Sequence, residues 1–242
     1  MSFMNRFFLA ALVLTAVSFP AAPARADTSG FFGPAAEPVI ARLRNTYYYL
    51  VREADYAKYA ADDVLLDMED RELEQVSSRF RKALDIEGSG HLLNGKVVNF
   101  AGVKNGRIRY RYTRNAWGDG VGTCALVPFH SIAVDPKVIK LGSLVRIDET
   151  VGMRLPDGSI HDGLWRAVDV GGAIRGDRVD LFVGDGDQGR VLDAARIGHL
   201  QPLTVRLVEE PASDSCVHNT FETSGNPKDL LLLQTDWNAP QS

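Results

Sequence analysis

The sequence has little of what several large protein classes need. It holds only two cysteines, Cys124 and Cys216, in 242 residues, with no Cys-x-x-Cys pair and no cysteine–histidine cluster at ligand spacing. We therefore expect no metal site and no cofactor. No strongly basic segment is present and the formal net charge is −4, so nucleic acid is not an expected partner. No Gly-x-Ser-x-Gly motif of a serine hydrolase occurs either.

Long hydrophobic runs are also missing, apart from one near the start of the chain. Arg6 precedes an apolar run over residues 7–19, and an Ala-Arg-Ala sequence follows at 24–26. This order predicts a signal peptide over residues 1–26, and the apolar run is too short for a stable membrane span. No cysteine lies near the cleavage site, so we predict an exported protein, periplasmic or secreted, without a lipid anchor.

Export has a consequence for the two cysteines. An oxidising compartment permits disulfides, and an even pair in an exported chain favours one bridge. We therefore predict a disulfide between Cys124 and Cys216.

Short apolar runs separated by turn residues predict a mainly β fold. A linker rich in Gly, Ala and Pro covers residues 27–43, and a polar tail, apart from Leu230–Leu233, covers residues 211–242. Between them, regularly punctuated short strands are typical of a compact barrel. The predicted strands cover residues 46–51, 97–100, 108–112, 131–134, 144–147, 165–168, 179–183 and 203–208. A helix is the alternative for residues 46–51, because residues 53–59 have helical composition.

Three short helical segments are predicted beside these strands. One covers residues 77–85, with Ser77 as its cap. A second covers residues 189–197 and ends at Gly198. A third is a short helical turn over residues 39–44.

Residues 167–182, with the sequence AVDVGGAIRGDRVDLF, are the most informative stretch of the chain. Asp169 closes an apolar run, and Asp180 lies within a predicted strand after a glycine-rich turn. Because side chains alternate in a strand, Asp180 shares a face with Phe182. A carboxylate beside a phenyl ring can have its pKa raised, which suits a general acid. The alternative is that Asp169 caps a turn and Asp180 is an ordinary surface residue.

Three segments together resemble the membrane-bound lytic transglycosylase A family and its three-aspartate domain. They are residues 87–98 (EGSGHLLNGKVV), residues 131–142 (SIAVDPKVIKLG) and the stretch 167–182. The aspartates for which that domain is named match Asp135, Asp169 and Asp180. The resemblance implies a double-psi β-barrel, which we place over residues 44–210.

The resemblance also implies an activity. Members of the family cleave the β-1,4 bond between N-acetylmuramic acid and N-acetylglucosamine in peptidoglycan glycan strands. It assigns the catalytic acid/base to Asp180 and a supporting role to Asp169. We predict substrate-binding roles, with turn formation as the alternative for each, for six further residues: Glu87, Ser89, Gly90, Asp135, Gly171 and Gly172.

The chain departs from the family's pattern in three respects. It has Glu87 where glutamine is usual, it lacks the lipid-bearing cysteine, and it is expected to be too short for the large second domain that forms one wall of the glycan groove. These departures keep open a non-catalytic cell-wall glycan-binding module. A hydrolase that uses Asp169 as its second carboxylate is a third hypothesis.

Overall fold

The computed structural model describes residues 37–218. The predicted signal peptide, most of the predicted linker and the Leu230–Leu233 run lie outside the described residues. In the described part of the chain, no helix is both long and apolar enough to cross a membrane.

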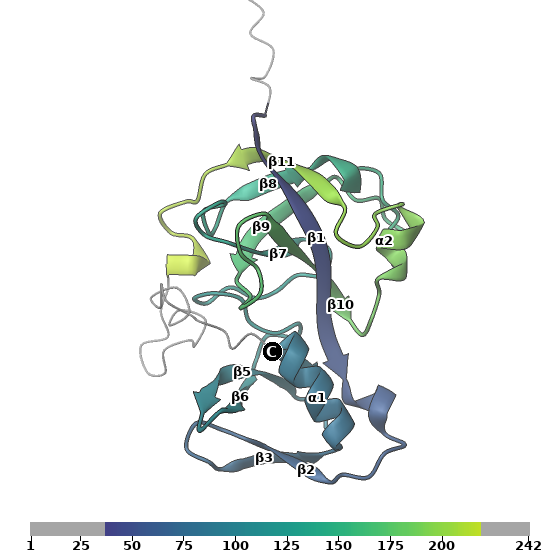
Figure 1. Ribbon diagram of the computed structural model, residues 1–242, viewed down its shortest axis with the longest axis vertical. Helices are drawn as coiled ribbons and strands as arrows, with labels where there is room; N and C mark the ends of the chain where they lie inside the picture. The colour runs from purple at the N-terminus through teal and green to yellow at the C-terminus, as the bar shows by residue number, and fades with distance from the viewer. Residues whose placement is uncertain (1–36, 219–242) are drawn as a thin grey trace, which may run out of the picture. The chain divides into compact units, whose positions relative to one another are not determined.

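Six strands close into a barrel, which is the upper part of the molecule in Figure 1. Each strand pairs with the next in the order β10, β7, β9, β8, β11 and β1, and a parallel pairing of β1 with β10 closes the ring. The β7–β9 pair is also parallel. The strands of the barrel are β1 (Val39–Arg52), β7 (Ser131–Val134), β8 (Leu144–Ile147), β9 (Leu164–Asp169), β10 (Arg178–Asp185) and β11 (Pro202–Glu209).

Alternation along the barrel strands produces its core. Val179, Leu181 and Val183 on β10 all belong to the main hydrophobic cluster, as the period of two requires. Trp165 on β9 is fully buried in the same cluster, and its indole N–H donates to Thr150 Oγ1 at 2.9 Å. This closed barrel confirms the predicted fold class, a mainly β double-psi barrel with short helices.

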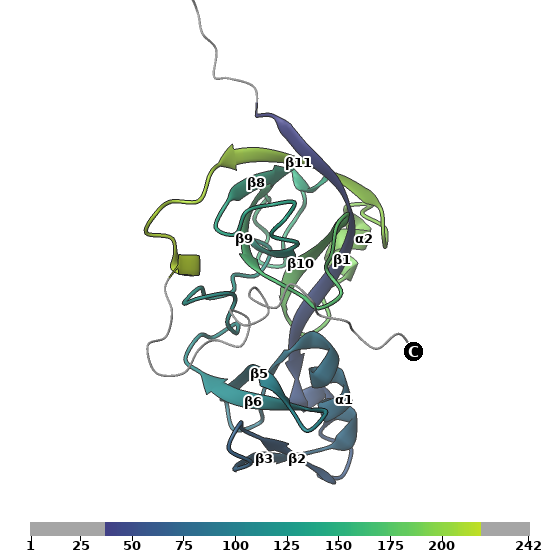
Figure 2. The same cartoon turned by 60° about the vertical axis from the view of Figure 1, so that its left-hand side comes forward.

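A smaller layer packs beside the barrel and has a core of its own. Figure 2 shows helix α1 against the β5–β6 pair, with the β2–β3 hairpin below them. The elements of this layer are η1 (Glu53–Tyr56), β2 (Asp63–Leu66), β3 (Glu72–Val76), α1 (Ser78–Glu87), β4 (Ser89–His91), β5 (Val97–Lys104) and β6 (Arg107–Thr113). Strand β1 belongs to both parts, because its last residues pair with β4.

Helix α1 forms for the reasons that its sequence indicates. Ser77 caps it, and its side chain accepts a hydrogen bond from the N–H of Phe80. Phe80 and Leu84, four residues apart, are both fully buried in the core of the smaller layer. The helix ends at Gly88, which has a φ of +82°, a conformation that glycine adopts without steric cost.

Two local predictions were wrong. Residues 39–44 are not a helical turn, because their backbone pairs with β11, so the first barrel strand begins inside the predicted linker. Helix α2 covers only Arg190–Ala194 instead of reaching Gly198. Arg196, at a φ of +61°, reverses the chain there, and the N–H of Ile197 bonds to the carbonyl of Leu192. The remaining short helices are η2 (Asp148–Thr150) and η3 (Cys216–His218).

Candidate active site

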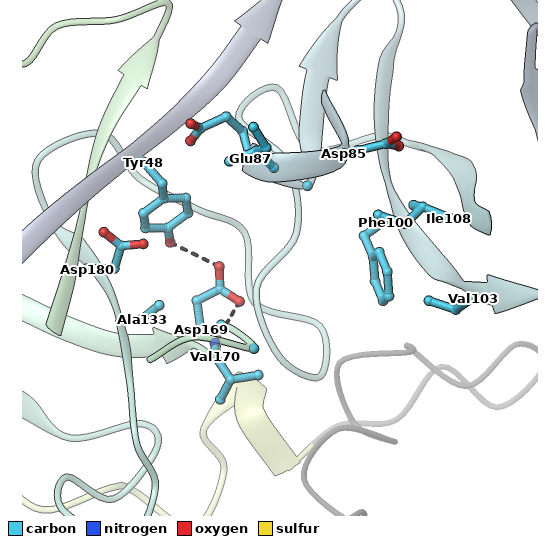
Figure 3. A pocket seen from close by; sticks show the side chains of 14 residues that line it. Tyr48, Asp85, Glu87, Phe100, Val103, Ile108, Ala133, Asp169, Val170 and Asp180 are labelled. Carbon is cyan, nitrogen blue, oxygen red and sulfur yellow. Dashed lines mark hydrogen bonds between the residues drawn. The ribbon is translucent and has the colours of Figure 1, made fainter. Parts of the chain in front are cut away.

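A cavity of about 280 Å³ lies between the barrel and the smaller layer. Each side contributes two carboxyl groups: the barrel side carries Asp169 and Asp180, and the end of α1 carries Asp85 and Glu87. Strands β5 and β6 add apolar side chains beside the end of α1. Figure 3 shows both sets of side chains around the opening. The lining residues are Tyr48, Asp85, Ile86, Glu87, Gly88, Phe100, Val103, Ile108, Ala133, Asp169, Val170, Gly171, Gly172 and Asp180.

The smaller layer therefore supplies a second wall, which the length of the chain did not lead us to expect. Phe100 and Val103 come from β5, and Ile108 comes from β6. The inserted layer between β1 and β7 thus faces the barrel across the cavity.

Asp180 lies on the barrel side of the cavity, where its surroundings favour the protonated form of its carboxyl group. Its neighbours across the sheet are Thr46 on β1 and Ala133 on β7. Its Oδ1 is buried and has no hydrogen-bond partner among the described residues. Burial raises the pKa of Asp180 to about 6, and the nearby Asp169 adds to the rise. A hydrogen bond from the Thr46 side chain and the positive charge of Arg178 oppose it.

Asp169 is held in place by specific hydrogen bonds. The Tyr48 hydroxyl donates to its Oδ2 at 3.0 Å, and the N–H of Val170 donates to its Oδ1 at 2.8 Å (Figure 3). Only 2 % of Asp169 is exposed. Both carboxylate oxygens thus accept hydrogen bonds, which fix the orientation of the group. This arrangement suits a supporting role more than attack on a substrate carbon.

Glu87 brings a third carboxyl group to the cavity. It is the last residue of α1, and its Oε2 accepts a hydrogen bond from the N–H of Tyr49 at 3.2 Å. Burial raises the pKa of Glu87 to about 7, and repulsion by Asp180 and Asp187 adds to the rise. The negative end of the helix dipole acts in the same direction. Glu87 can therefore carry a proton in the cavity near neutral pH.

The predicted substrate-binding residues separate into two groups. Glu87, Gly171 and Gly172 line the cavity, and a Cβ added at Gly172 would meet nothing within 4 Å. Ser89 and Gly90 do not line it, because both are buried on β4: Gly90 faces α1, and the Ser89 side chain lies beside Gly118.

Gly90 has a packing role instead. A Cβ at this position would lie 2.7 Å from Leu84 Cδ1 and 3.2 Å from the carbonyl oxygen of Val51. The close approach of α1 to β4 therefore requires glycine.

Asp135 also lies outside the cavity lining. Its Oδ1 accepts from the N–H of Lys137 at 2.9 Å, and its Oδ2 accepts from the N–H of Gly176 at 2.8 Å. These backbone hydrogen bonds lower its pKa against the opposing effect of burial. Asp135 thus anchors the glycine-rich turn that carries Gly171 and Gly172 into the cavity, as its turn-forming alternative predicted.

Sequence reasoning missed Thr46 and Tyr48 as site residues. Both lie on the face of β1 that borders Asp180, and the Tyr48 ring packs at a tilt against Phe182 with ring centroids 5.0 Å apart. Their two-residue spacing in a predicted strand does show that they share a face. What it does not show is that β1 pairs with β10, which follows more than 120 residues later.

The two cysteines are joined by a disulfide close to this site. Cys124 packs in one cluster with Tyr48, Ala133 and Phe182, and Cys216 packs against that cluster. The bridge therefore joins the segment after β11 to the hydrophobic cluster that packs behind the barrel side of the cavity.

Comparisons with known proteins agree with part of this description. Residues 130–195 match the family model of the 3D domain. The match confirms the predicted resemblance over the part of the chain that includes Asp135, Asp169 and Asp180. No match was found among curated proteins.

Several solved structures have a related chain path. The structure of MltA from Escherichia coli with bound chitohexaose is 16% identical, covers 71% of this chain and 72% of its own, and has a TM-score of 0.48. LtgG of Burkholderia pseudomallei, a lytic transglycosylase, is 20% identical, covers 69% of this chain and 73% of its own, and has a TM-score of 0.38. A membrane-bound lytic murein transglycosylase from Agrobacterium tumefaciens is 15% identical, covers 69% of this chain and 73% of its own, and has a TM-score of 0.42. Because these TM-scores are below 0.5, no activity is transferred from them to this chain.

Proposed function

We propose that the protein is an exported lytic transglycosylase that cleaves the β-1,4 bond between N-acetylmuramic acid and N-acetylglucosamine in peptidoglycan. One observation carries the proposal: among the carboxyl groups that line the cavity, Asp180 has a buried oxygen with no hydrogen-bond partner among the described residues, and its pKa is raised to about 6. The match of residues 130–195 to the 3D domain and the resemblance of residues 87–98 support it.

The proposed reaction needs only one proton-transferring group. Protonated Asp180 donates its proton to the glycosidic oxygen as the bond to C1 of the muramyl residue breaks. The resulting carboxylate then takes the proton of that residue's own C6 hydroxyl, whose oxygen closes onto C1. Because the attacking hydroxyl belongs to the substrate, it is present at a high effective concentration at C1, and the reaction needs no bound water as nucleophile. The product ends in 1,6-anhydro-N-acetylmuramic acid, and Asp180 has its proton back.

Asp169 and Tyr48 have positioning roles in this proposal. The negative charge of Asp169 beside Asp180 favours the protonated starting state of the acid. The Tyr48 hydroxyl, by donating to Asp169, keeps that charge fixed on one side of the cavity. Neither residue has to form a bond to the sugar.

The product distinguishes this reaction from hydrolysis. Sacculi digested in oxygen-18 water should release muropeptides that carry no label at the muramyl end, have no reducing end, and are lighter by one water than lysozyme products. Mass spectrometry of the fragments is the measurement. Label at C1 would instead support a hydrolase. Binding to sacculi without any release would support the glycan-binding module.

The rate should depend on pH through the protonation of Asp180. An acid with a pKa of about 6 is protonated below pH 6 and loses its proton above it. We therefore expect kcat/KM to fall on the alkaline side, with an apparent pKa between about 6 and 7 because Glu87 shares the cavity. The pH profile of fragment release measures this.

A matched variant separates the two carboxyl groups. Glu87→Gln should keep an alkaline limb, because Asp180 still titrates. Disappearance of the limb in Glu87→Gln would assign it to Glu87 and contradict the proposed acid.

A further inference from the structure

Arg178 is a half-buried arginine on the same strand face as Asp180, two residues earlier in β10. Residues i and i+2 of a strand are about 6.6 Å apart and point the same way. The register agrees, since Arg178 lies opposite Arg44 and Asp180 lies opposite Thr46. Arg178 therefore continues the site along β1 and β10, past Asp180.

Arg178 lies on the side of Asp180 that is away from the smaller layer. Glu87, at the end of α1, bonds to the N–H of Tyr49, three residues beyond Thr46 on β1. Arg178 lies on the other side of Thr46, at the level of Arg44. Along β1, Asp180 thus lies between the end of α1, which carries Glu87, and the cationic side chain of Arg178.

Hydrogen bonds connect Arg178 to the acid through one hydroxyl. Its Nη2 donates to Thr46 Oγ1 at 3.1 Å, and the Thr46 side chain bonds to Asp180. The Nε of Arg178 is buried without a hydrogen-bond partner. Among the described residues no carboxylate forms a salt bridge with this guanidinium, although its charge acts at longer range on Asp180 and Asp177 and acts to lower the pKa of both.

The chain's other shielded arginines are satisfied differently. Arg81 pairs with Asp85 at 2.8 Å. Arg109 pairs with Asp70 at 2.9 Å, and Arg111 pairs with Asp119 at 2.7 Å. Removing a charge from water is costly unless it is paired, which explains those contacts. Arg178 has only longer-range interactions with Asp180 and Asp177 and no salt bridge among the described residues, so a carboxylate of the substrate would supply the close ion pair that the other arginines have.

We propose that Arg178 is a specificity-determining residue that pairs with a carboxylate carried by the muramyl unit of the substrate. The inference rests on the proposed function, since it places the muramyl unit at Asp180. Guanidinium and carboxylate match in geometry and form charge-assisted hydrogen bonds. The carboxylate belongs either to the lactyl ether of a denuded strand or to a stem peptide. An uncharged N-acetylglucosamine polymer lacks both.

The test measures binding in the Asp180→Asn background, where turnover does not interfere. Three tetrasaccharides of alternating N-acetylglucosamine and N-acetylmuramic acid serve as ligands in isothermal titration calorimetry: one with free lactyl carboxylates, one with these groups amidated, and one carrying L-Ala-D-Glu stems. Adding Arg178→Gln should weaken the affinity for the anionic ligand whose carboxylate pairs with Arg178 about tenfold. It should change the affinity for the amidated ligand by less than about twofold. Whichever anionic ligand loses affinity identifies the source of the carboxylate.

Control variants keep the result interpretable. Arg190→Gln, on the exposed face of α2, removes the same charge and should leave all three affinities unchanged. Arg178→Lys should recover part of the preference for the anionic ligand. If Arg178→Gln does not fold, the Asp180→Asn protein alone must still prefer the anionic over the amidated ligand about tenfold. Equal losses for charged and neutral ligands, or none, overturn the inference.

Failure of the proposed function would look different. A wild-type protein that releases no fragments from sacculi contradicts the transglycosylase proposal. The charge preference conferred by Arg178 is measured by binding and is read independently of that outcome.

Discussion

Asp180→Asn is expected to reduce fragment release from sacculi by roughly a thousandfold or more, which is the upper part of the range for loss of general acid–base catalysis. The amide has the shape of the carboxyl group but can neither donate the proton to the glycosidic oxygen nor recover it. Release of soluble muropeptides, followed by chromatography, measures the loss.

The same variant should fold at least as well as the wild type. The pKa of Asp180 is raised in the fold to about 6, so the folded state favours the protonated form. The stability that this form contributes is complete below the unfolded pKa of about 4 and is lost as the pH rises through about 6. Asp180→Asn removes the buried charge that remains above pH 6, and its melting temperature at pH 8 should equal or exceed that of the wild type.

Two further variants define what the loss means. Asp193→Asn, at an exposed position on α2, should retain full activity. Asp169→Asn should cost less than Asp180→Asn and should move the alkaline limb to lower pH, because the charge of Asp169 contributes to the raised pKa of Asp180. Substantial turnover by Asp180→Asn would show that another group supplies the proton.

Breaking the disulfide should have the largest effect on stability. The bridge joins Cys124 and Cys216, which are 92 residues apart. Closing a loop of that length in the unfolded chain stabilises the fold by about 4 kcal/mol in the chain-entropy model. For a chain of this size, that corresponds to a fall in melting temperature of roughly 10 °C in the Cys124→Ser/Cys216→Ser variant.

Reductant provides the control for this prediction. A thiol reductant should lower the melting temperature of the wild type towards that of the double serine variant and should not change the variant itself. Identical melting of the oxidised and reduced wild type would show that the bridge does not contribute. Because Cys124 packs in the cluster with Tyr48 and Phe182, the reduced protein should also lose activity at temperatures below its melting point.

Local features of the chain could be predicted because their causes are local. The Ser77 cap and the spacing of Phe80 and Leu84 define α1, and the period of two in residues 179–183 places Asp180 on the face away from the barrel core. The boundaries that failed depended on distant partners. Residues 39–44 are a strand only because β11 lies beside them.

The mainly β fold class could be predicted from the sequence itself, because it depends on residue types and spacing within short stretches. The proposed acid and its supporting aspartate follow from the resemblance of residues 167–182 to a known family, and the cysteine pair follows from there being only two cysteines in a chain expected to be exported. The tertiary structure decided which side chains meet. The closure of β1 on β10 brings Thr46, Tyr48 and Arg178 to Asp180, and the folding of the inserted layer builds the second wall of the cavity. The same packing buries Ser89 and Gly90 and makes Asp135 the anchor of a turn. Residue spacing along the chain does not encode these contacts, because they form between strands that are far apart in the sequence and are fixed only when the sheet closes.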